Sequence, residues 1–405
     1  MGLEAYLRRV IREGGLELNL PGGGNVVIGD EARPKVAVTL RSPIWAARIL
    51  ANPEVAVGDA YMDGALVLER GDIYDLLELA GRNQPARKRP PPSAFARWRH
   101  DMLATRNARR QARRNVQAHY DVSNTFYRRF LDADLQYSCA YFTEPGLSLE
   151  DAQRAKQRHI EAKLLLRPGQ KVLDIGCGWG GLALRLAADA GVQVEGVTLS
   201  TEQLDLARRR AEESGLHDRV GYALTDYRDV AGPYDRIVSV GMFEHVGRPN
   251  YAAYFGQIAR LLKDEGVAVV HSIGRFEGPD VTQPWIAKHI FPGGYIPALS
   301  EALAAVERSG LMVTDVEILR LHYAETLRAW RRRFAAQRHE VAATRGERFC
   351  RMWEFYLAAS EIGFRYGGHM VFQLQLAKRI DAVPLTRNYI QQTERDLAEE
   401  RRTAA

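Results

Sequence analysis

The chain has 405 residues, of which 46% are hydrophobic and 26% are charged, and its formal net charge is +6. This length allows two domains with separate hydrophobic cores, and the composition is ordinary for a soluble protein. No apolar run approaches the roughly 20 residues that span a bilayer, and the N-terminus lacks the order of a signal peptide. The three cysteines, Cys139, Cys177 and Cys350, lie far apart, which argues against a disulfide framework and a zinc site. We therefore expect a cytoplasmic protein without a bound metal.

Residues 1–81 have the pattern of a small α+β domain. Two strand-like apolar segments and two segments with helical spacing occur in it, at 16–20, 35–40, 44–50 and 73–80. Asp72 stands where a helix cap is expected for the last of these. The domain contains no acid–base or metal-ligand constellation, so we interpret it as a positioning domain.

Residues 82–116 form a basic linker with eleven Lys or Arg residues and a single acid, Asp101. The aromatic residues Phe95 and Trp98 are interleaved with these charges. Such a stretch can dock on anionic lipid, contact nucleic acid, or simply separate two domains. Its composition alone favours the role of a linker.

From residue 117 onward, predicted strands alternate with predicted helices, which implies a doubly wound parallel sheet. The strands begin at Val172 and Val194 and continue with 220–224, 236–240 and 267–270. Ligands of such sheets bind at the carboxyl ends of the strands. The polar residues at or just beyond these ends are therefore the candidate site residues. They are Asp174, Thr198, Asp226, Glu244 and His271.

The first of these strands leads into a glycine turn within residues 171–181. Its glycines are Gly176, Gly178, Gly180 and Gly181. Because glycine has no side chain, a ligand can approach the backbone closely. The spacing fits either a dinucleotide-binding loop or the S-adenosylmethionine (SAM) loop of class I methyltransferases. The acid at Asp174 and the Cys-Gly-Trp-Gly core resemble the SAM loop, whereas Thr198 stands where a ribose-binding acid is expected in either family.

Beyond Arg275 the composition changes. Residues 284–294 resemble an aromatic, turn-rich insertion, and a long helix is expected to run through Arg333. Residues 349–376 are apolar and aromatic at helical spacing. These elements either cover an apolar cavity or pack the core, and for 349–376 taken alone the core is favoured.

The sequence resembles the cyclopropane-fatty-acyl-phospholipid synthases and the related mycolic acid cyclopropane synthases. The matching segments are 119–124, 136–142, 172–181, 196–200, 243–247, 271–274, 291–294 and 322–327 with Trp330. They occur in the family's order over most of residues 115–380, and a threonine such as Thr198 is usual there. The resemblance implies a class I SAM-dependent methyltransferase domain at 117–405 with a lipid-facing helical cover, preceded by a small lipid-positioning domain.

This resemblance also implies a reaction, the transfer of the SAM methyl group to a cis double bond of an unsaturated phospholipid acyl chain. The resulting cation loses a proton and closes to a cyclopropane, which requires a site that excludes water. The base is implied to be a bound bicarbonate. It would be held by backbone groups of Cys139 and Ile273 and by the side chains of Glu244, His271 and Tyr323.

For SAM, the resemblance implies four groups of contacts along the strand ends. These are Tyr137 and Ser138 for the amino-acid end, Asp174, Gly176 and Gly178 at the loop, Thr198, Leu199 and Gln203 for the ribose, and Asp226 and Tyr227 for the adenine. Some relatives carry a cysteine, once proposed to be catalytic, where this chain has Ser360. That difference argues against a cysteine mechanism and leaves the bicarbonate mechanism untouched.

Three alternatives accompany this interpretation. A C-methyltransferase acting on the same alkene would give a methyl or methylene branch, and the motifs do not separate it from a cyclopropane synthase. A nucleic-acid methyltransferase usually has Asn/Asp-Pro-Pro-aromatic after the fourth strand, and this chain has Gly-Met-Phe-Glu at 241–244. A lipid-binding protein without turnover would not need Glu244, His271 and Tyr323. We expect peripheral contact with the inner face of a membrane, no nucleic-acid partner, and a homodimer as one assembly.

Overall fold

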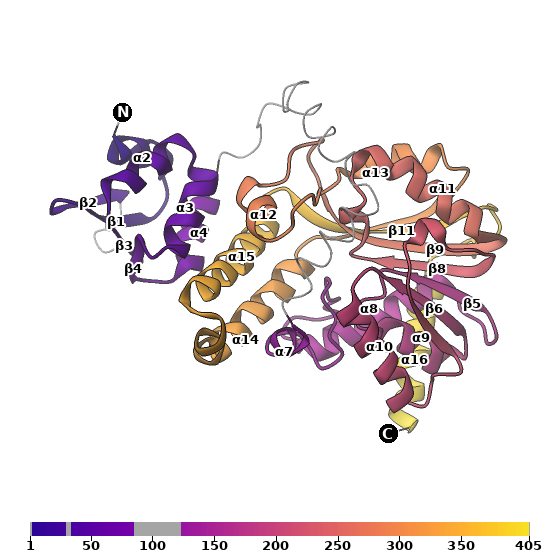
Figure 1. Cartoon of the computed structure of the whole chain (residues 1–405). Helices are drawn as coiled ribbons and strands as arrows, with labels where there is room; N and C mark the ends of the chain where they lie inside the picture. Colours follow the sequence, from indigo (N-terminus) through magenta and orange to yellow (C-terminus); the bar gives the residue numbers. More distant parts are fainter. Residues whose placement is uncertain (1, 30–33, 85–122, 405) are drawn as a thin grey trace. The chain divides into compact units, whose positions relative to one another are not determined.

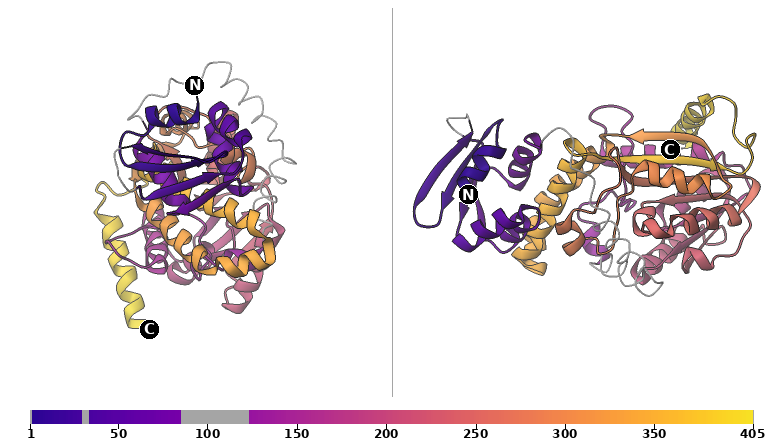
Figure 2. Two further views of the ribbon diagram at one scale, coloured as in Figure 1. Left: turned by 90° about the vertical axis from the view of Figure 1, so that its left-hand side faces the viewer. Right: turned by 90° about the horizontal axis from the view of Figure 1, so that it is seen from above.

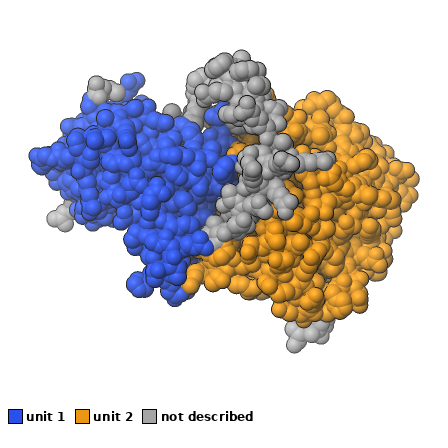
Figure 3. Space-filling model, in the orientation of Figure 1, with its two compact units in different colours: residues 1–92, 281–292, 324–369 blue, residues 93–280, 293–323, 370–405 orange. Residues whose placement is uncertain are grey.

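The computed structural model of the chain describes residues 2–29, 34–84 and 123–404. Nearly all of the predicted basic linker at 82–116 lies outside the described residues, as does most of the matching segment 119–124. The chain divides into two compact units (Figure 3). Unit 1 comprises 1–92, 281–292 and 324–369, and unit 2 comprises 93–280, 293–323 and 370–405.

Unit 1 contains a four-stranded sheet in the order β2-β1-β3-β4, drawn in indigo and violet in Figure 2. The strands are β1 (Gly15–Leu20), β2 (Gly24–Gly29), β3 (Val36–Leu40) and β4 (Leu66–Arg70). β1 pairs antiparallel with β2 and parallel with β3, and β3 pairs antiparallel with β4. Alternating apolar residues of β1 and β3, such as Leu18 and Val38, are buried beneath the helices. The expected small α+β domain is confirmed.

Among the described residues, seven helices belong to unit 1 wholly or in large part. They are α1 (Leu3–Val10), α2 (Pro43–Ala51), α3 (Pro53–Met62), α4 (Ile73–Arg82), α12 (Pro284–His289), α14 (His322–Arg345) and α15 (Glu347–Arg365). α4 begins with a capping box in which Asp72 and Asp75 satisfy each other's backbone N–H groups. α12 lies in the segment predicted to be an irregular insertion, and its Trp285 is fully buried. α14 starts in unit 2, at His322 and Tyr323, before it continues in unit 1.

Unit 2 is built on a seven-stranded sheet in the order β10-β11-β9-β8-β5-β6-β7. The strands are β5 (Lys171–Ile175), β6 (Gln193–Thr198), β7 (Val220–Leu224), β8 (Tyr234–Val240), β9 (Leu262–Arg275), β10 (Met312–Leu319) and β11 (His369–Ala377). In the sheet order, neighbouring strands of the part β9-β8-β5-β6-β7 pair in parallel. Strands β10 and β11 pair antiparallel. The sheet is therefore mixed, with the expected doubly wound parallel part at its centre.

Helices cover both faces of this sheet (Figure 1). They are α8 (Leu149–Leu164), α9 (Gly181–Ala190), α10 (Thr201–Glu213), α11 (Tyr251–Leu261), α13 (Leu299–Glu307) and α16 (Asn388–Ala404), with a short α7 (Asn124–Tyr127) before them. Short 3-10 turns lie at Tyr227–Asp229, Phe243–His245 and Arg248–Asn250. One core contains α11 and α13 and the other contains α8, α9 and α10, which is the layering of an α/β sandwich.

The prediction for 349–376 was wrong at its C-terminal end. α15 ends at Arg365, and His369–Ala377 forms strand β11 after the Gly367-Gly368 break. A strand buried on both faces forms a continuous apolar run, and periodicity alone does not distinguish it from a helix segment. No helix of the described residues is long and apolar enough to cross a membrane.

Candidate active site

The carboxyl ends of the parallel strands gather the predicted site residues at one edge of the sheet. Asp174 lies in β5, Thr198 closes β6, and Asp226 follows β7. Glu244 lies in the 3-10 turn after β8, and His271 lies in β9, paired with Val240 at the end of β8. The predicted end of the fifth strand at His271 was too early, because β9 continues to Arg275.

The glycine turn after β5 has the geometry that its sequence predicts. Gly176, Gly178 and Gly180 all have positive φ angles, of 84°, 55° and 80°, which side chains rarely tolerate. The Gly176 N–H donates to the carbonyl oxygen of Val197 over 2.9 Å, which ties the turn to β6. A Cβ atom on Gly178 would have no described neighbour within 4 Å, so the turn faces open space there.

Asp174 is a buried carboxylate beneath this turn. Its Oδ2 atom has no hydrogen-bond partner among the described residues. Burial raises the pKa of Asp174 to about 7, and the nearby Lys156 ammonium opposes that shift. Lys156 on α8 is itself fully buried, and its pKa is lowered to about 8 by burial against the pull of neighbouring acids. A polar ligand at the turn would satisfy the free carboxylate oxygen.

The segment that carries Tyr137 and Ser138 is held by α8. The Lys156 ammonium donates to Ser138 Oγ over 3.0 Å and also to the Gln136 side chain. The Gln153 amide donates to the Ser138 carbonyl oxygen over 3.0 Å. The Tyr137 ring packs edge-on against Tyr127, with ring centroids 5.3 Å apart. These contacts fix the backbone of the segment expected to meet the amino-acid end of SAM.

The residues expected near the ribose form one hydrogen-bonded group. Thr198 Oγ1 donates to Gln203 Oε1 over 2.9 Å and accepts from the Ser200 N–H. Leu199 lies between them and is half-buried. The structure thus brings the end of β6 and the first turn of α10 together around a polar pair.

The residues expected near the adenine follow β7. Asp226 caps the 3-10 turn, and its Oδ1 accepts from Arg228 Nε over 2.8 Å. The Tyr227 ring meets Tyr254 edge-on at 5.4 Å, and burial raises the pKa of Tyr227 to about 12. Since Arg228 bonds both oxygens of the Asp226 carboxylate, an adenine contact would share that carboxylate with Arg228.

Glu244 is held from two sides. Its Oε1 accepts from the Ile273 N–H over 2.6 Å, and its backbone carbonyl accepts from the Tyr295 N–H over 2.9 Å. The other carboxylate oxygen, Oε2, is buried and unpartnered within the described part of the chain. Burial raises the pKa of Glu244 to about 7. The Ile273 N–H thus positions this carboxylate, and the predicted backbone contact of Ile273 with bicarbonate stays a prediction.

His271 lies two residues before Ile273 on β9 and is 2% exposed. Its Nδ1 lies 3.1 Å from the side-chain nitrogen of Gln373 on β11. Burial, together with the charges of Lys156, Lys163 and His159, lowers the pKa of His271 well below its usual value. The imidazole is therefore neutral at physiological pH.

Cys139 and Tyr323 lie on two segments that contact each other. The Phe142 N–H donates to His322 Nδ1 over 3.0 Å, and the Tyr141 ring stacks on the His322 ring at 5.1 Å. Cys139 is 1% exposed, and Tyr323, in the first turn of α14, is 8% exposed. The roles assigned to both residues stay predictions.

Comparison with known proteins identifies the family of the chain. A family model described as mycolic acid cyclopropane synthetase matches residues 107–374. The chain belongs to this family. Another model, described only as a domain of unknown function, matches residues 5–89.

Individual members of the family match along most of the chain. The cyclopropane-fatty-acyl-phospholipid synthase of Escherichia coli K12 is 38% identical over 346 residues, which cover 85% of this chain and 88% of that protein. A Pseudomonas putida protein named "Probable fatty acid methyltransferase" is 38% identical over 375 residues, covering 90% and 92%. The crystal structure of mycolic acid cyclopropane synthase CmaA1 with SAH and CTAB has a TM-score of 0.62 at 34% identity and covers 65% of this chain and 97% of that one. The present chain is therefore a SAM-dependent methyltransferase. The unpartnered Oδ2 of Asp174 and the open space beside Gly178 fit a bound SAM molecule.

Sequence reasoning missed the buried polar residues that support the site. Lys156 and Lys163 on α8 and Gln373 on β11 are fully buried. Lysines seven residues apart lie on one helix face, and Ile160 on that same face is also buried. A charged residue on a face otherwise marked as apolar was the available signal.

Proposed function

We propose that this enzyme transfers the methyl group of SAM to a cis double bond of an unsaturated phospholipid acyl chain, and that a cyclopropane forms when bound bicarbonate removes a proton. The observation that carries the proposal is the carboxylate of Glu244. Its Oε1 accepts from the N–H of Ile273, two residues after His271 on β9, and its buried Oε2 has no hydrogen-bond partner among the described residues. Membership of the mycolic acid cyclopropane synthetase family supports the same reaction.

Alkene methylation requires a site in which a positive sulfonium and a weak carbon nucleophile meet without water. SAM, when bound, supplies the electrophilic methyl group. The chain's own contribution is burial: Cys139, Glu244, His271 and Tyr323 are each at most 8% exposed. A cation formed beside these residues is shielded from bulk water, which would otherwise trap it.

The side chains proposed to hold bicarbonate suit a small planar anion. Bicarbonate, when bound, supplies a base for the proton that the alkylated chain must lose. The Ile273 N–H fixes Glu244 Oε1, which leaves Oε2 to accept a hydrogen bond from the hydroxyl group of the anion. The His271 imidazole and the Tyr323 phenol are the donors that the anionic oxygens require.

The proposal includes a lipid surface as partner. A phospholipid substrate brings the enzyme to a membrane, and we propose peripheral contact with the inner face of the membrane through the N-terminal domain and the basic linker. The linker's eleven cations favour an anionic lipid surface, at about 1 kcal/mol for each charge near it. A homodimer would present two such surfaces to one bilayer.

The second candidate is a C-methyltransferase on the same alkene. The Pseudomonas putida relative named as a fatty acid methyltransferase supports it as strongly, by identity, as the Escherichia coli synthase supports a cyclopropane. Methyl transfer is common to both reactions, and only the fate of the cation differs. Loss of a proton from the added methyl group with ring closure gives a cyclopropane, whereas a hydride shift from the methylated carbon to the neighbouring cationic carbon before that proton is lost gives a methylene branch. A methyl-branched chain would require a further reduction by a separate hydride donor.

The test is incubation of the protein with methyl-labelled SAM and vesicles of unsaturated phospholipid, followed by mass spectrometry of the acyl chains. We expect acyl chains heavier by one CH2 unit, with the label in a ring methylene by NMR. Label in an open-chain methyl or methylene carbon would support the second candidate. Unmodified acyl chains would contradict both candidates.

A further inference from the structure

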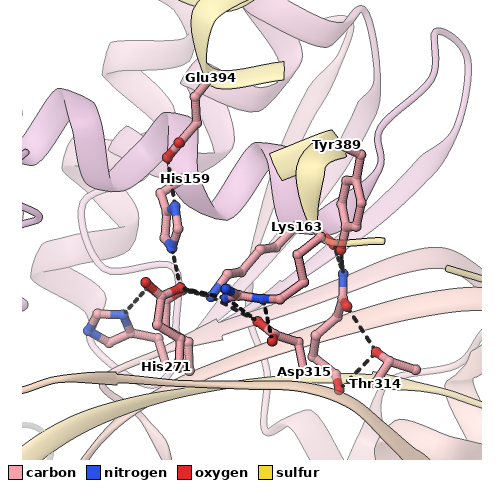
Figure 4. A network of polar contacts seen from close by, with 11 residues as sticks. His159, Lys163, His271, Thr314, Asp315, Tyr389 and Glu394 are labelled. Atoms are coloured by element: carbon pink, nitrogen blue, oxygen red, sulfur yellow. Dashed lines mark hydrogen bonds and ion pairs between the residues drawn. The ribbon is translucent and has the colours of Figure 1, made fainter. Parts of the chain in front are cut away.

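A line of polar contacts runs from α8 to His271 (Figure 4). Lys163 Nζ donates to Gln373 Oε1 over 2.9 Å. On the other side of the same amide, Gln373 Nε2 lies 3.1 Å from His271 Nδ1. All three side chains are buried, so no bulk water competes for these contacts.

The donors and acceptors along this line determine the orientation of the Gln373 side-chain amide. A lysine ammonium has three donors and no acceptor, so it must meet the amide oxygen rather than the amide nitrogen. Turning the amide over would place an NH2 group against Lys163 in a buried site and leave the ammonium without that partner. The amide nitrogen therefore faces His271.

This arrangement also determines the protonation of the imidazole. The NH2 group of Gln373 is only a donor, so His271 Nδ1 must accept with its lone pair. In a neutral imidazole the one ring proton then resides on Nε2, at the opposite side of the ring. The environment that lowers the pKa of His271 keeps the ring in this neutral form.

Lys163 is itself held in place. Its ammonium donates to Glu317 Oε2 over 2.5 Å and lies 3.5 Å from Asp315 Oδ2, both on β10. Its backbone carbonyl accepts from the Gln375 amide over 2.6 Å, and that amide also meets the Tyr389 hydroxyl. With its charge balanced and its backbone fixed, Lys163 provides a rigid origin for the line of contacts.

We propose that Lys163 and Gln373 are positioning residues, which hold His271 as the Nε2–H tautomer so that the ring donates a hydrogen bond to the small anion of the reaction. This inference rests on the proposed function for the identity of the anion. The opposite tautomer would turn a lone pair toward a negative charge. Loss of either positioning residue therefore weakens anion binding without touching SAM.

The experiment is 15N NMR of histidine-labelled full-length protein, with the His271 signals assigned from their loss in His271→Gln. In the wild type we expect a protonated Nε2 and an unprotonated Nδ1. Gln373→Glu replaces the donor by an acceptor, so we expect the proton to move to Nδ1 or the ring to become doubly protonated. Gln283→Glu makes the same change at a side chain that caps α12 outside this line of contacts, and His271 should keep its wild-type signals there.

A second variant covers the case in which Gln373→Glu does not fold. Gln373→Leu removes the hydrogen bond with little change in volume, and we expect a mixture of tautomers. Turnover should fall about 10- to 100-fold with SAM affinity unchanged, as for other residues that orient a site histidine.

An unprotonated Nε2 in the wild type, or an unchanged tautomer in both Gln373 variants, would overturn the inference. The NMR result does not depend on turnover. Absence of a lipid product would therefore contradict the proposed function and leave the tautomer assignment standing.

Discussion

Glu244 is the residue on which the proposed proton transfer depends most directly. Glu244→Gln keeps an oxygen for the Ile273 N–H and replaces the free Oε2 by a donor that cannot accept from an anion. We expect turnover to fall by about 100-fold or more, as for loss of a group that acts in proton transfer. SAM affinity, measured by calorimetry, should be nearly unchanged, and a parallel loss of turnover and SAM affinity would show that Glu244 is structural.

The same carboxyl predicts an acid limb in the pH profile. Burial raises the pKa of Glu244 to about 7, so its ionised form is lost as the pH falls through that value. At saturating SAM, kcat/KM for the lipid should therefore rise with pH around pH 7, and Glu244→Gln should lack this limb. The pKa of Asp174 is also about 7. Its titration is distinguished from that of Glu244 by measuring SAM affinity as a function of pH, because Asp174 lies at the proposed SAM site. A profile that is flat through neutrality would contradict the assignment.

Stability should show the opposite dependence. Folding raises the pKa of both carboxyls, from 3.8 for Asp174 and 4.5 for Glu244 to about 7. The folded protein thus binds more protons than the unfolded chain between these values. The contribution of both groups to the free energy of unfolding is full below pH 3.8 and is lost as the pH rises through about 7.

Site residues at the ends of apolar strands were predictable from the sequence, whereas the buried polar residues that support them were not. Glu244 and His271 follow apolar strands in short motifs, which marks strand ends. Lys156 and Lys163 lie on a helix rich in charge, where a lysine is normally solvated. The sequence signal for their burial is weak, because only the helix face that they share with Ile160 marks it. Their partners come from other segments, Gln136 and Ser138 for Lys156 and strands β10 and β11 for Lys163.

At the scale of elements, the glycine turn after β5 offers a matched pair of substitutions. Gly178 and Gly215 both have positive φ angles, of 55° and 67°, and neither would bring a Cβ atom within 4 Å of a described neighbour. Alanine at either position should cost about 1–2 kcal/mol of stability through backbone strain. Only Gly178→Ala should also weaken SAM binding, because the open space beside it is the proposed SAM site. Equal SAM affinities in the two variants, measured by calorimetry, would place SAM elsewhere.

The elements themselves were predictable to different degrees. Strands β5 to β9 and the helices between them follow the alternation of the sequence, since each buries a continuous apolar segment. β11 was predicted as helix, because it is buried on both faces and its polar residues, Gln373 and Gln375, are satisfied by distant partners. The pattern of apolar and polar residues in the sequence does not show which distant residues bond Gln373 and Gln375.

At the scale of the molecule, residues far apart in sequence share unit 1. Lys288 and His289 on α12 both bond Asp59, over 2.7 Å each. The Tyr61 hydroxyl donates to Glu354 over 3.0 Å. The domain limits at 81 and 116 were predicted from changes in composition along the chain. Composition does not show which distant segments contact each other, so those limits remain sequence-based predictions.

The basic linker gives a prediction for the whole enzyme at a membrane. Replacement of Arg109, Arg110, Arg113 and Arg114 by alanine removes four of its charges. At about 1 kcal/mol per charge, we expect binding to anionic vesicles to weaken by roughly 4 kcal/mol at low salt. SAM affinity should not change. Equal sedimentation of variant and wild type with the vesicles would contradict a lipid-binding role.

In the proposed mechanism this enzyme holds a small planar anion between Glu244 and His271, and the anion takes up the proton. The most direct measurement is a crystal structure of the protein with S-adenosylhomocysteine in bicarbonate buffer. We predict density for a planar anion in hydrogen-bond contact with Glu244 Oε2 and with the Nε2–H of His271, and none in Glu244→Gln. A water molecule alone at that place, or side chains that fill it, would contradict the claim.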